Sequence, residues 1–379
     1  MPNTLTALQP ILFSAAQQVS AEPFGVVDAI ATDFSDQGVA RGDVVKVPVA
    51  PTRAAADFEP GNVANTGGDA VADEVSVQIT KSRKVSWHLT GEQLRSLDNG
   101  ATSAEWIRQL VAQGMRTLRN EAEVDCAAAI KVGASRAFGT AATNPFAGSP
   151  GNINAIADVR KILADNGAPL ADLQLCMDTT SGTNLRKLGI IQQADQAGSD
   201  AERRSGNFLR QFGFQLRESA GIRPHTAGTG EDYVTSGITA ARSRAVTLAT
   251  GTGTILPGDI VSFAADTANK YVVGAGITAP GVITLGRPGA LVEIPTANAL
   301  TVGAAYTPLL AFERSAIVGI MRPPVMPPNP TISQMLISDG MGMTYLMLDI
   351  SQYGQRTWEL HLAWGFKVVQ GEHVAILLG

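Results

Sequence analysis

Residue types that could support catalysis occur along the sequence, but their spacing favours structural roles. The stretch TTSGT (179–183) follows an apolar strand pattern and begins a helical one, the position of the nucleophilic serine in some hydrolases. Thr179 replaces the first glycine of that hydrolase pattern. We therefore expect Thr179, Thr180 or Ser181 to cap the helix rather than to attack a substrate.

Motif spacing indicates neither metal binding nor dinucleotide binding. The four histidines never pair at metal-ligand spacing and neither cysteine has a close partner, which argues against a zinc site. The stretches GTGTILPG and GAGITAPG lack the third glycine of a dinucleotide-binding loop, so we interpret them as turns. Because no nucleophile, base and orienting group share one pattern, we expect no enzymatic activity and no cofactor. The side chains considered are His88, His225, His361, His373, Cys126 and Cys176.

The composition is typical of a globular chain in a reducing compartment. With 379 residues, 45% of them hydrophobic, and 39 glycines, two or three compact units rich in turns are expected. A net charge of −5 provides no basic patch dense enough to read nucleic acid directly. The first residues lack a signal-peptide pattern, and no stretch reaches the roughly 18 apolar residues of a membrane span. We expect a cytoplasmic protein whose Cys126 and Cys176 are buried, reduced thiols.

The strongest secondary-structure pattern is a long helix. From Thr102 the stretch TSAEWIRQLVAQGMRTLRNEAEVDCAAAIKVGAS repeats apolar residues at three- and four-residue steps, and Thr102 and Glu105 have the spacing of a capping box. The pattern predicts one amphipathic helix of about 30 residues and about 45 Å. Because heptads are missing, the helix is expected to be a spine for sheets and other chains rather than a coiled coil.

Two strand patterns precede this helix and predict an extended hairpin. GDVVKVPVAP (42–51) and VSVQITKSRKVSWHL (75–89) alternate apolar and polar residues, and more than twenty residues without a period separate them. A loop of that length is uncommon in a compact domain unless it acts outside the domain. Residues 1–38 suit an arm that lies along another surface.

The second half of the chain alternates helix, strand and turn patterns. NINAIADVRKILADNG predicts a helix that ends at Asn166–Gly167, and LQLCMD (173–178) predicts a buried strand. From 226 to 306, six short strand patterns at eight- to twelve-residue spacing predict a small β-barrel or sandwich, inserted where a surface loop stood. LLAFERSAIVGIMRPPVMPP is predicted to form a helix with a proline stop, and the remaining C-terminal residues to form three or four strands.

The order of these elements resembles the major capsid proteins of tailed bacteriophages, which have the Hong Kong 97-type fold. The β-module before LLAFERSAIVGIMRPP resembles the insertion domain of the short-tailed-phage branch, and TWELHLAWGFKVVQGEHVAIL resembles the C-terminal strand pair of that branch. The resemblance implies an α+β fold. Its parts would be an N-terminal arm (1–38), an extended hairpin loop (39–90), a peripheral domain with the spine helix (91–151), an axial domain (152–225 and 307–325), an inserted β-barrel domain (226–306) and C-terminal peripheral-domain strands (326–379).

The resemblance also implies a function, which is that of a structural capsid subunit. Many copies would assemble, as hexamers and pentamers and with scaffolding and portal proteins, into the icosahedral shell of a virion. The shell would form in the host cytoplasm without membrane contact and enclose double-stranded DNA without sequence-specific binding. Arg53, Asp57 and Glu59 in the hairpin loop are the expected inter-subunit charges. The lysine and asparagine that cross-link some relatives match no positions here, so no cross-link is expected.

Two other classes of protein stay open on sequence grounds. A cytoplasmic ligand-binding protein with a pocket in the β-module would be a monomer or dimer that binds a small ligand saturably. A tail or portal subunit of the same virion would form rings rather than closed particles.

Overall fold

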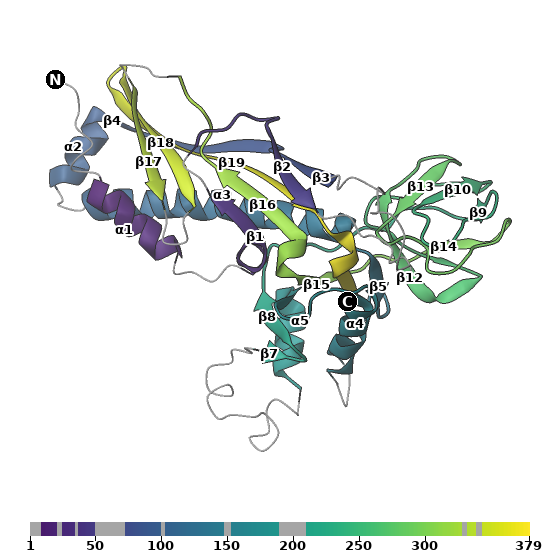
Figure 1. Cartoon of the computed structure of the whole chain (residues 1–379). Coiled ribbons are helices and arrows are strands. Elements are labelled where there is room, and N and C mark those ends of the chain that lie inside the picture. Colours follow the sequence, from purple (N-terminus) through teal and green to yellow (C-terminus); the bar gives the residue numbers. More distant parts are fainter. Residues whose placement is uncertain are drawn as a thin grey trace, which may run out of the picture.

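The fold is described by a computed structural model, in which a long helix joins two β-sheets (Figure 1). Helix α3 (Ser103–Gly133) has 31 residues and runs the length of the six-stranded sheet, which confirms the long helix predicted from the apolar spacing. At 1.5 Å per residue the helix is about 46 Å long. The structure describes residues 9–20, 25–34, 37–49, 73–99, 103–147, 153–188, 210–327, 332–338 and 343–379.

The six-stranded sheet is organised around its longest strand, β19. One edge of β19 pairs with β4 from Gln355↔Thr90 to Trp364↔Lys81, and the other edge is shared by β18 and β16. The path across the sheet is β1-β16-β19-β18-β17. Its strands are β1 (Ala31–Phe34), β4 (Lys81–Thr90), β16 (Ile317–Arg322), β17 (Ile332–Ser338), β18 (Thr344–Gln352) and β19 (Gln355–Val368).

Two shorter helices accompany α3 on this side of the molecule. Helix α2 (Gly91–Asn99) follows β4, and α1 (Gln9–Ser20) lies along α3 (Figure 1). The described part of the arm predicted for residues 1–38 therefore packs on the chain's own body, with α1 on the spine helix and β1 beside β16. The buried residues of α1 recur at helical steps and belong to the same core as α3 and the sheet. They are Leu12, Ala15, Ala16 and Val19.

The second sheet has twelve strands, and its first half forms an αβ unit with two helices. Helices α4 (Asn154–Asp165) and α5 (Thr179–Arg186) share one buried apolar cluster with β6, β8, β15 and β20. The helix that ends at Asn166–Gly167 and the fully buried strand at 173–178 are both confirmed. The strands are β5 (Arg136–Phe138), β6 (Leu173–Met177), β7 (Arg210–Gln211), β8 (Phe214–Glu218), β15 (Pro308–Glu313) and β20 (Val374–Leu378).

Two local predictions are wrong. The segment predicted as a helix before the prolines consists of β15, a short 3-10 turn at Arg314–Ala316, and β16. All six residues of β15 are buried, and a strand buried on both faces is a continuous apolar run that periodicity cannot distinguish from a buried helix. The cap of α5 is Asp178, whose carboxylate accepts hydrogen bonds from the backbone N–H groups of Thr180 and Ser181.

The other half of this sheet comes from residues 234–302, which lie beyond the C-terminal end of α3 (Figure 1). Their buried side chains, from Tyr233 to Leu300, form a cluster of their own. Strands β10 to β13 lie where the turn spacing predicted strands, whereas residues 291–296 contribute only a bridge at Ile294. The strands are β9 (Val234–Thr235), β10 (Ala245–Ala249), β11 (Ile260–Phe263), β12 (Asp266–Ala275), β13 (Val282–Leu285) and β14 (Leu300–Val302).

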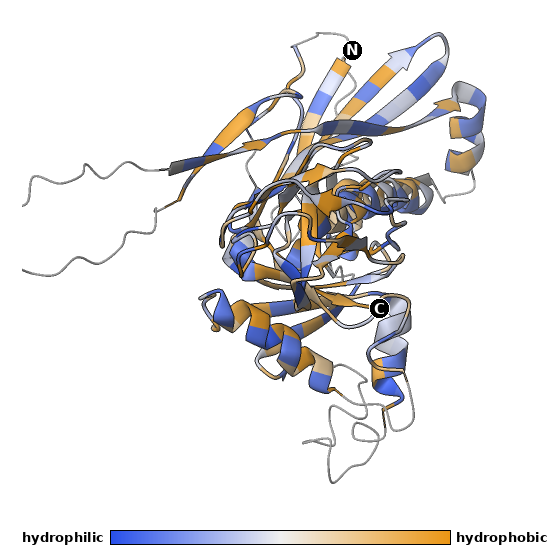
Figure 2. Ribbon diagram, turned by 90° about the vertical axis from the view of Figure 1, so that its right-hand side faces the viewer, coloured by the Kyte–Doolittle hydropathy of each residue, from blue (hydrophilic) through white to orange (hydrophobic). Residues whose placement is uncertain are grey.

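The predicted hairpin is present as a separate two-stranded ribbon. Strands β2 (Val44–Val49) and β3 (Asp73–Gln78) pair antiparallel from Val44↔Gln78 to Val49↔Asp73. The ribbon projects from the rest of the molecule (Figure 2). Strands β17 to β20 confirm the predicted run of C-terminal strands.

Candidate assembly surfaces

Within the part of the chain that the structure describes, the β2–β3 ribbon is only half covered. Val45 and Val47 on the inner side are partly buried against an apolar cluster that includes Val77, whereas Val44 is 50% exposed. Lys46 pairs with Glu74 across the two strands at 2.5 Å, and that contact raises the pKa of Lys46. An ion pair this exposed adds little stability. The ribbon therefore keeps apolar surface available to another partner.

The base of the ribbon is fixed firmly to the six-stranded sheet. Gly42 has a φ of +100° in the turn before β2, and its N–H donates to the carbonyl of Ile79. The N–H of Thr80 donates to the carbonyl of Trp364 on β19. Gly365 lies so close to β3 that a Cβ there would be 2.1 Å from the Gln78 carbonyl oxygen. The anchored base thus fixes the position of the ribbon on the six-stranded sheet.

The predicted inter-subunit charges lie outside the described residues. Arg53, Asp57 and Glu59 belong to residues 50–72, which connect the two strands of the ribbon. The structure shows where this segment begins and ends, because Val49 and Asp73 are cross-strand partners. The role of the three charges stays a prediction.

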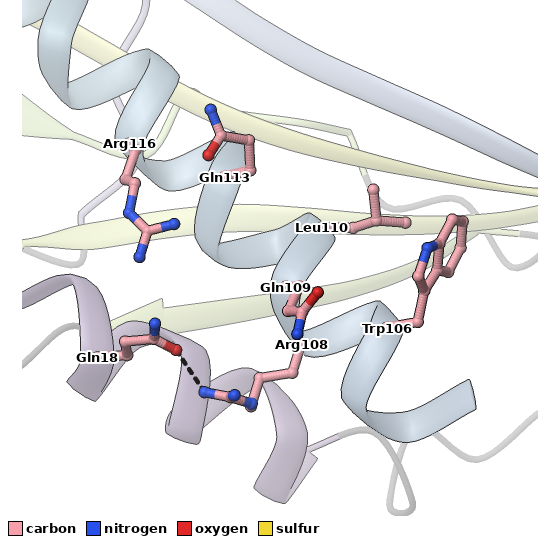
Figure 3. Close-up of a pocket in the computed structure, with 7 residues that line it drawn as sticks. All are labelled: Gln18, Trp106, Arg108, Gln109, Leu110, Gln113 and Arg116. Carbon is pink, nitrogen blue, oxygen red and sulfur yellow. Dashed lines mark hydrogen bonds between the residues drawn. The ribbon is translucent and has the colours of Figure 1, made fainter. Parts of the chain in front are cut away.

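A polar groove lies between α1 and α3 (Figure 3). Its volume is about 450 Å³. Arg108 binds Glu105 through both carboxylate oxygens and also donates to Gln18 on α1, so its charge is already neutralised. The ion pair lowers the pKa of Glu105 and raises that of Arg108. We interpret the groove as a contact that holds α1 on the spine. The lining residues are Gln18, Trp106, Arg108, Gln109, Leu110, Gln113 and Arg116.

An apolar groove of about 400 Å³ lies beside the edge strand β17. Val325 and Leu336, which line it, are 61% and 45% exposed. Within the described residues, β17 pairs only with β18, so its outer edge has no partner strand there. Exposed apolar surface beside an unpaired strand edge is typical of a surface that another chain covers.

Charged side chains on the spine helix hold the parts of the molecule together. Lys81 and Arg83 on β4 pair with Asp125 and Glu121 on α3, at 2.9 and 2.8 Å. The buried carboxylate of Glu123 accepts from Ser219 and from two backbone N–H groups of the N-terminal segment. These contacts join the spine helix to β4, to the N-terminal segment and to the residue that follows β8.

Sequence reasoning missed one buried polar arrangement, at the point where residues 226–306 join the rest of the chain. His225 Nε2 lies 2.7 Å from Asp259 Oδ1, and His225 Nδ1 lies 3.1 Å from Lys131 Nζ. Lys131 and His225 are 94 positions apart, and His225 and Asp259 are 34 apart. No local spacing could have revealed these contacts, because the fold alone brings the three side chains together.

The two cysteines are buried and free, as predicted. Burial raises the pKa of both thiols, so neither is activated as a nucleophile. Among the described residues, no three His, Cys, Asp or Glu side chains gather as metal ligands would. None of the described helices has the length and apolar character needed to cross a membrane.

Comparisons with protein-family models and with curated sequences give no match. Solved structures match over most of the chain. A structure from Mycobacterium phage Che8 is 13% identical, with a TM-score of 0.46, and the alignment covers 89% of this chain and 84% of that chain. The capsid of cyanophage P-SCSP1u is 12% identical, with a TM-score of 0.48 and coverages of 93% and 88%. The capsid of a native GTA particle is 11% identical, with a TM-score of 0.47 and coverages of 96% and 90%.

Two of these three structures are described as capsids, the class of protein that the sequence resemblance predicted. With identities of 11–13% and TM-scores below 0.5, they are likenesses of overall architecture. Function is inferred from the chain's own elements.

Proposed function

We propose that this chain is a structural, non-enzymatic capsid subunit that assembles with many copies of itself into a closed shell. The observation that carries the proposal is the projecting β2–β3 ribbon. A two-stranded ribbon is marginally stable alone in water, and this one leaves Val44 half exposed while its base is locked to β19. A neighbouring copy would cover the ribbon and complete its burial.

The remaining elements support the same role. Helix α3 and the six-stranded sheet share one apolar core, which makes a rigid frame about 46 Å long. The apolar groove beside β17 offers a second surface on that frame. A shell held together by many interfaces of moderate strength can correct errors while it assembles. The ribbon and the groove, which the described residues leave half covered, would provide two such interfaces per subunit.

Within such a shell, we assign roles to the parts of the chain. Residues 39–90 extend across a neighbouring subunit, with Arg53, Asp57 and Glu59 in the contact. The spine region (91–151) and the C-terminal strands (326–379) form the peripheral domain. The axial domain (152–225 and 307–325) lies at the centre of hexamers and pentamers, and the inserted β-barrel domain (226–306) decorates the exterior. The cluster of residues 233–300 supports a separate β-module. The other two clusters cross these bounds, because Leu310 packs with the spine helix and Leu377 packs with α4 and α5.

The same proposal also names the other components of the particle. The shell belongs to a virion assembled in the host cytoplasm, with scaffolding and portal proteins, and it encloses double-stranded DNA. Contact with that DNA is independent of its sequence, because the chain carries a net charge of −5.

Sedimentation of the purified full chain tests this function. We expect particles in the megadalton range. The substitution Arg53→Glu reverses one charge of the predicted contact, so it should lower the amount of these particles without unfolding the subunit. The exposed Arg95→Glu on α2 is the matched control. A discrete monomer or dimer at every concentration would contradict the proposal, and ring-shaped assemblies would favour a tail or portal subunit.

A further inference from the structure

The six-stranded sheet ends in a strand whose side chains carry no charge. Among the described residues, β17 pairs only with β18, at the border of the sheet (Figure 1). Its sequence, ISQMLIS, contains neither a charged residue nor a proline. Ile337 is fully buried in the core that the sheet shares with the spine helix, and Met335 packs against that core. The strand is therefore held in one position, where its outer edge can pair with a further strand.

The other long edge strands in the described part of the chain carry groups that hinder strand addition. An open edge presents unpaired N–H and C=O groups, and charged side chains or prolines protect it from pairing with another chain. The protecting residues are Lys46 and Pro48 in β2, Asp73 and Glu74 in β3, and Lys81, Arg83 and Lys84 in β4. Of the described edge strands with six or more residues, β17 alone lacks this protection.

The surface beside β17 favours a neutral partner strand. Exposed apolar side chains of Val325 and Leu336 line the groove next to this edge. A strand that carries Lys46 or Glu74 would bring its charge against that apolar surface and lose hydration. The long edge strand of a second copy that matches this edge is β17 itself.

The contacts that a closed shell needs favour the same partner. In the proposed function, on which this inference rests, the ribbon of one copy lies on the frame of the next. Such a heterologous contact generates rings. A different contact must then join the rings into a shell. Two copies that meet through identical edges form an isologous contact about a two-fold axis, which is complete with one partner.

We propose that β17 of one subunit pairs antiparallel with β17 of a subunit in a neighbouring ring, which joins two six-stranded sheets into one. Identical antiparallel strands are related by a two-fold axis normal to the sheet, so each residue keeps its face in the second copy. Opposite residues of an antiparallel pair also share a face. Only residues an even number of positions apart can therefore lie opposite each other, and a register centred on Met335 pairs all seven residues of the strand.

This register brings the two apolar grooves together. Leu336 of one copy lies opposite Gln334 of the other, and both residues line the groove. Because the axis is normal to the sheet, the two grooves open on the same face of the joined sheet. The second copy then covers the exposed apolar side chains beside each edge.

Disulfide formation between two exposed positions tests the pairing and its register. Gln334→Cys and Leu336→Cys are made in separate full-length chains of different tag length, mixed in equal amounts and oxidised, while the native cysteines are buried. Opposite residues have Cβ atoms about 5 Å apart, whereas diagonal neighbours are about 7–8 Å apart. We expect the mixed disulfide dimer in clear excess over the proportion that random pairing gives. Ser86→Cys, at an exposed position on β4, is the matched control and should give no dimer.

Sedimentation of the same samples distinguishes failure of this pairing from failure of the proposed function. Shells without the mixed disulfide would overturn the β17 pairing and leave the capsid function standing. The mixed disulfide without shells would support the pairing and contradict the capsid function. Absence of both would contradict both.

A charge placed on the edge gives a second test, which needs no oxidation. Gln334→Lys provides the protection that β4 has, and a lysine can still donate to the Pro327 carbonyl, to which Gln334 donates at 3.0 Å. We expect loss of the shells in sedimentation, with rings left in their place. Ser86→Lys on β4 is the control and should assemble like the unsubstituted protein. Unchanged shells from Gln334→Lys would overturn the proposal.

Discussion

At the scale of single residues, the buried carboxylate of Glu123 holds three parts of the molecule together. It accepts from the N–H groups of Val26 and Val27 at 2.6 and 3.0 Å, and from the Ser219 hydroxyl at 2.8 Å. The N-terminal segment, the spine helix and the second sheet meet at this one side chain.

Replacing this carboxylate by an amide should destabilise the fold. Glu123→Gln keeps the size of the side chain but replaces one carboxylate oxygen by an NH2 group. That NH2 group would face an N–H or O–H donor, so we expect a loss of about 2 kcal/mol in the free energy of unfolding. Urea unfolding of the disassembled chain measures the change. Glu92→Gln, at an exposed position on α2, is the control and should stay within about 0.5 kcal/mol of the unsubstituted protein. Equal effects from both substitutions would show that Glu123 does not hold these parts together.

The pH dependence of stability should include a contribution from His361. Burial lowers the pKa of His361 below its usual value of about 6.5, while Glu359 acts in the opposite direction. The unfolded chain then binds the proton more tightly than the folded chain, so the contribution is fully present above about pH 6.5 and is lost as the pH falls below it. His361→Gln should flatten the decline of unfolding free energy between pH 7 and 5, and His88→Gln is the matched control. A decline as steep as in the unsubstituted protein would rule out this contribution.

Residue roles were predictable where they depend on neighbours in sequence. The turn at Asn166–Gly167 was predicted, and the cap of α5 was placed one to three residues late, because Asp178 had been assigned to the strand. The contact of His225 with Lys131 was not predictable, since only the fold brings the two side chains together.

At the scale of elements, the sequence predicted correctly those helices and strands in which apolar residues recur at a regular spacing. Helix α3 and the β2–β3 ribbon have clear periods, and the structure confirms both. Strand β15 has no period because both of its faces are buried, so its segment was mistaken for a helix. Its two faces lie in different buried clusters, because Leu310 and Phe312 pack with the spine helix, whereas Leu309 and Ala311 pack with α4 and α5.

The anchoring of the ribbon to β19 should depend on Gly365. A Cβ at this position would lie 2.1 Å from the backbone oxygen of Gln78, so Gly365→Ala must push β3 away from the sheet. We expect a loss of about 1–3 kcal/mol in stability and fewer assembled particles, measured by unfolding and sedimentation. Gly281→Ala, whose Cβ would meet nothing closer than 3.7 Å, is the control. Unchanged stability and assembly of Gly365→Ala would show that the ribbon is not anchored there.

Deletion of residues 227–306 tests the role of the β-module. The ends to be joined are close, because the backbone of His225 pairs with that of Tyr306. The deletion removes β12, the partner of β5, and uncovers the end of the spine helix. With a short linker between the ends, we expect impaired folding, measured by circular dichroism, or an altered shell size, measured by electron microscopy. Shells identical to those of the full chain would contradict a role for the module.

At the scale of the whole molecule, the described residues form a rigid frame with two surfaces that they leave half covered. The frame consists of α3 and the six-stranded sheet, and the incompletely covered surfaces are the β2–β3 ribbon and the apolar groove beside β17. The order of elements along the sequence predicted this architecture. No sequence pattern predicted the apolar groove beside β17, because the segments that line it meet only in the fold.

Electron microscopy of the assembled full chain tests the central claim most directly, since it locates residues 50–72 relative to neighbouring copies. The account predicts closed shells in which this segment of each subunit lies on the frame of the next. A monodisperse single molecule, with the same segment folded against its own body, would contradict it.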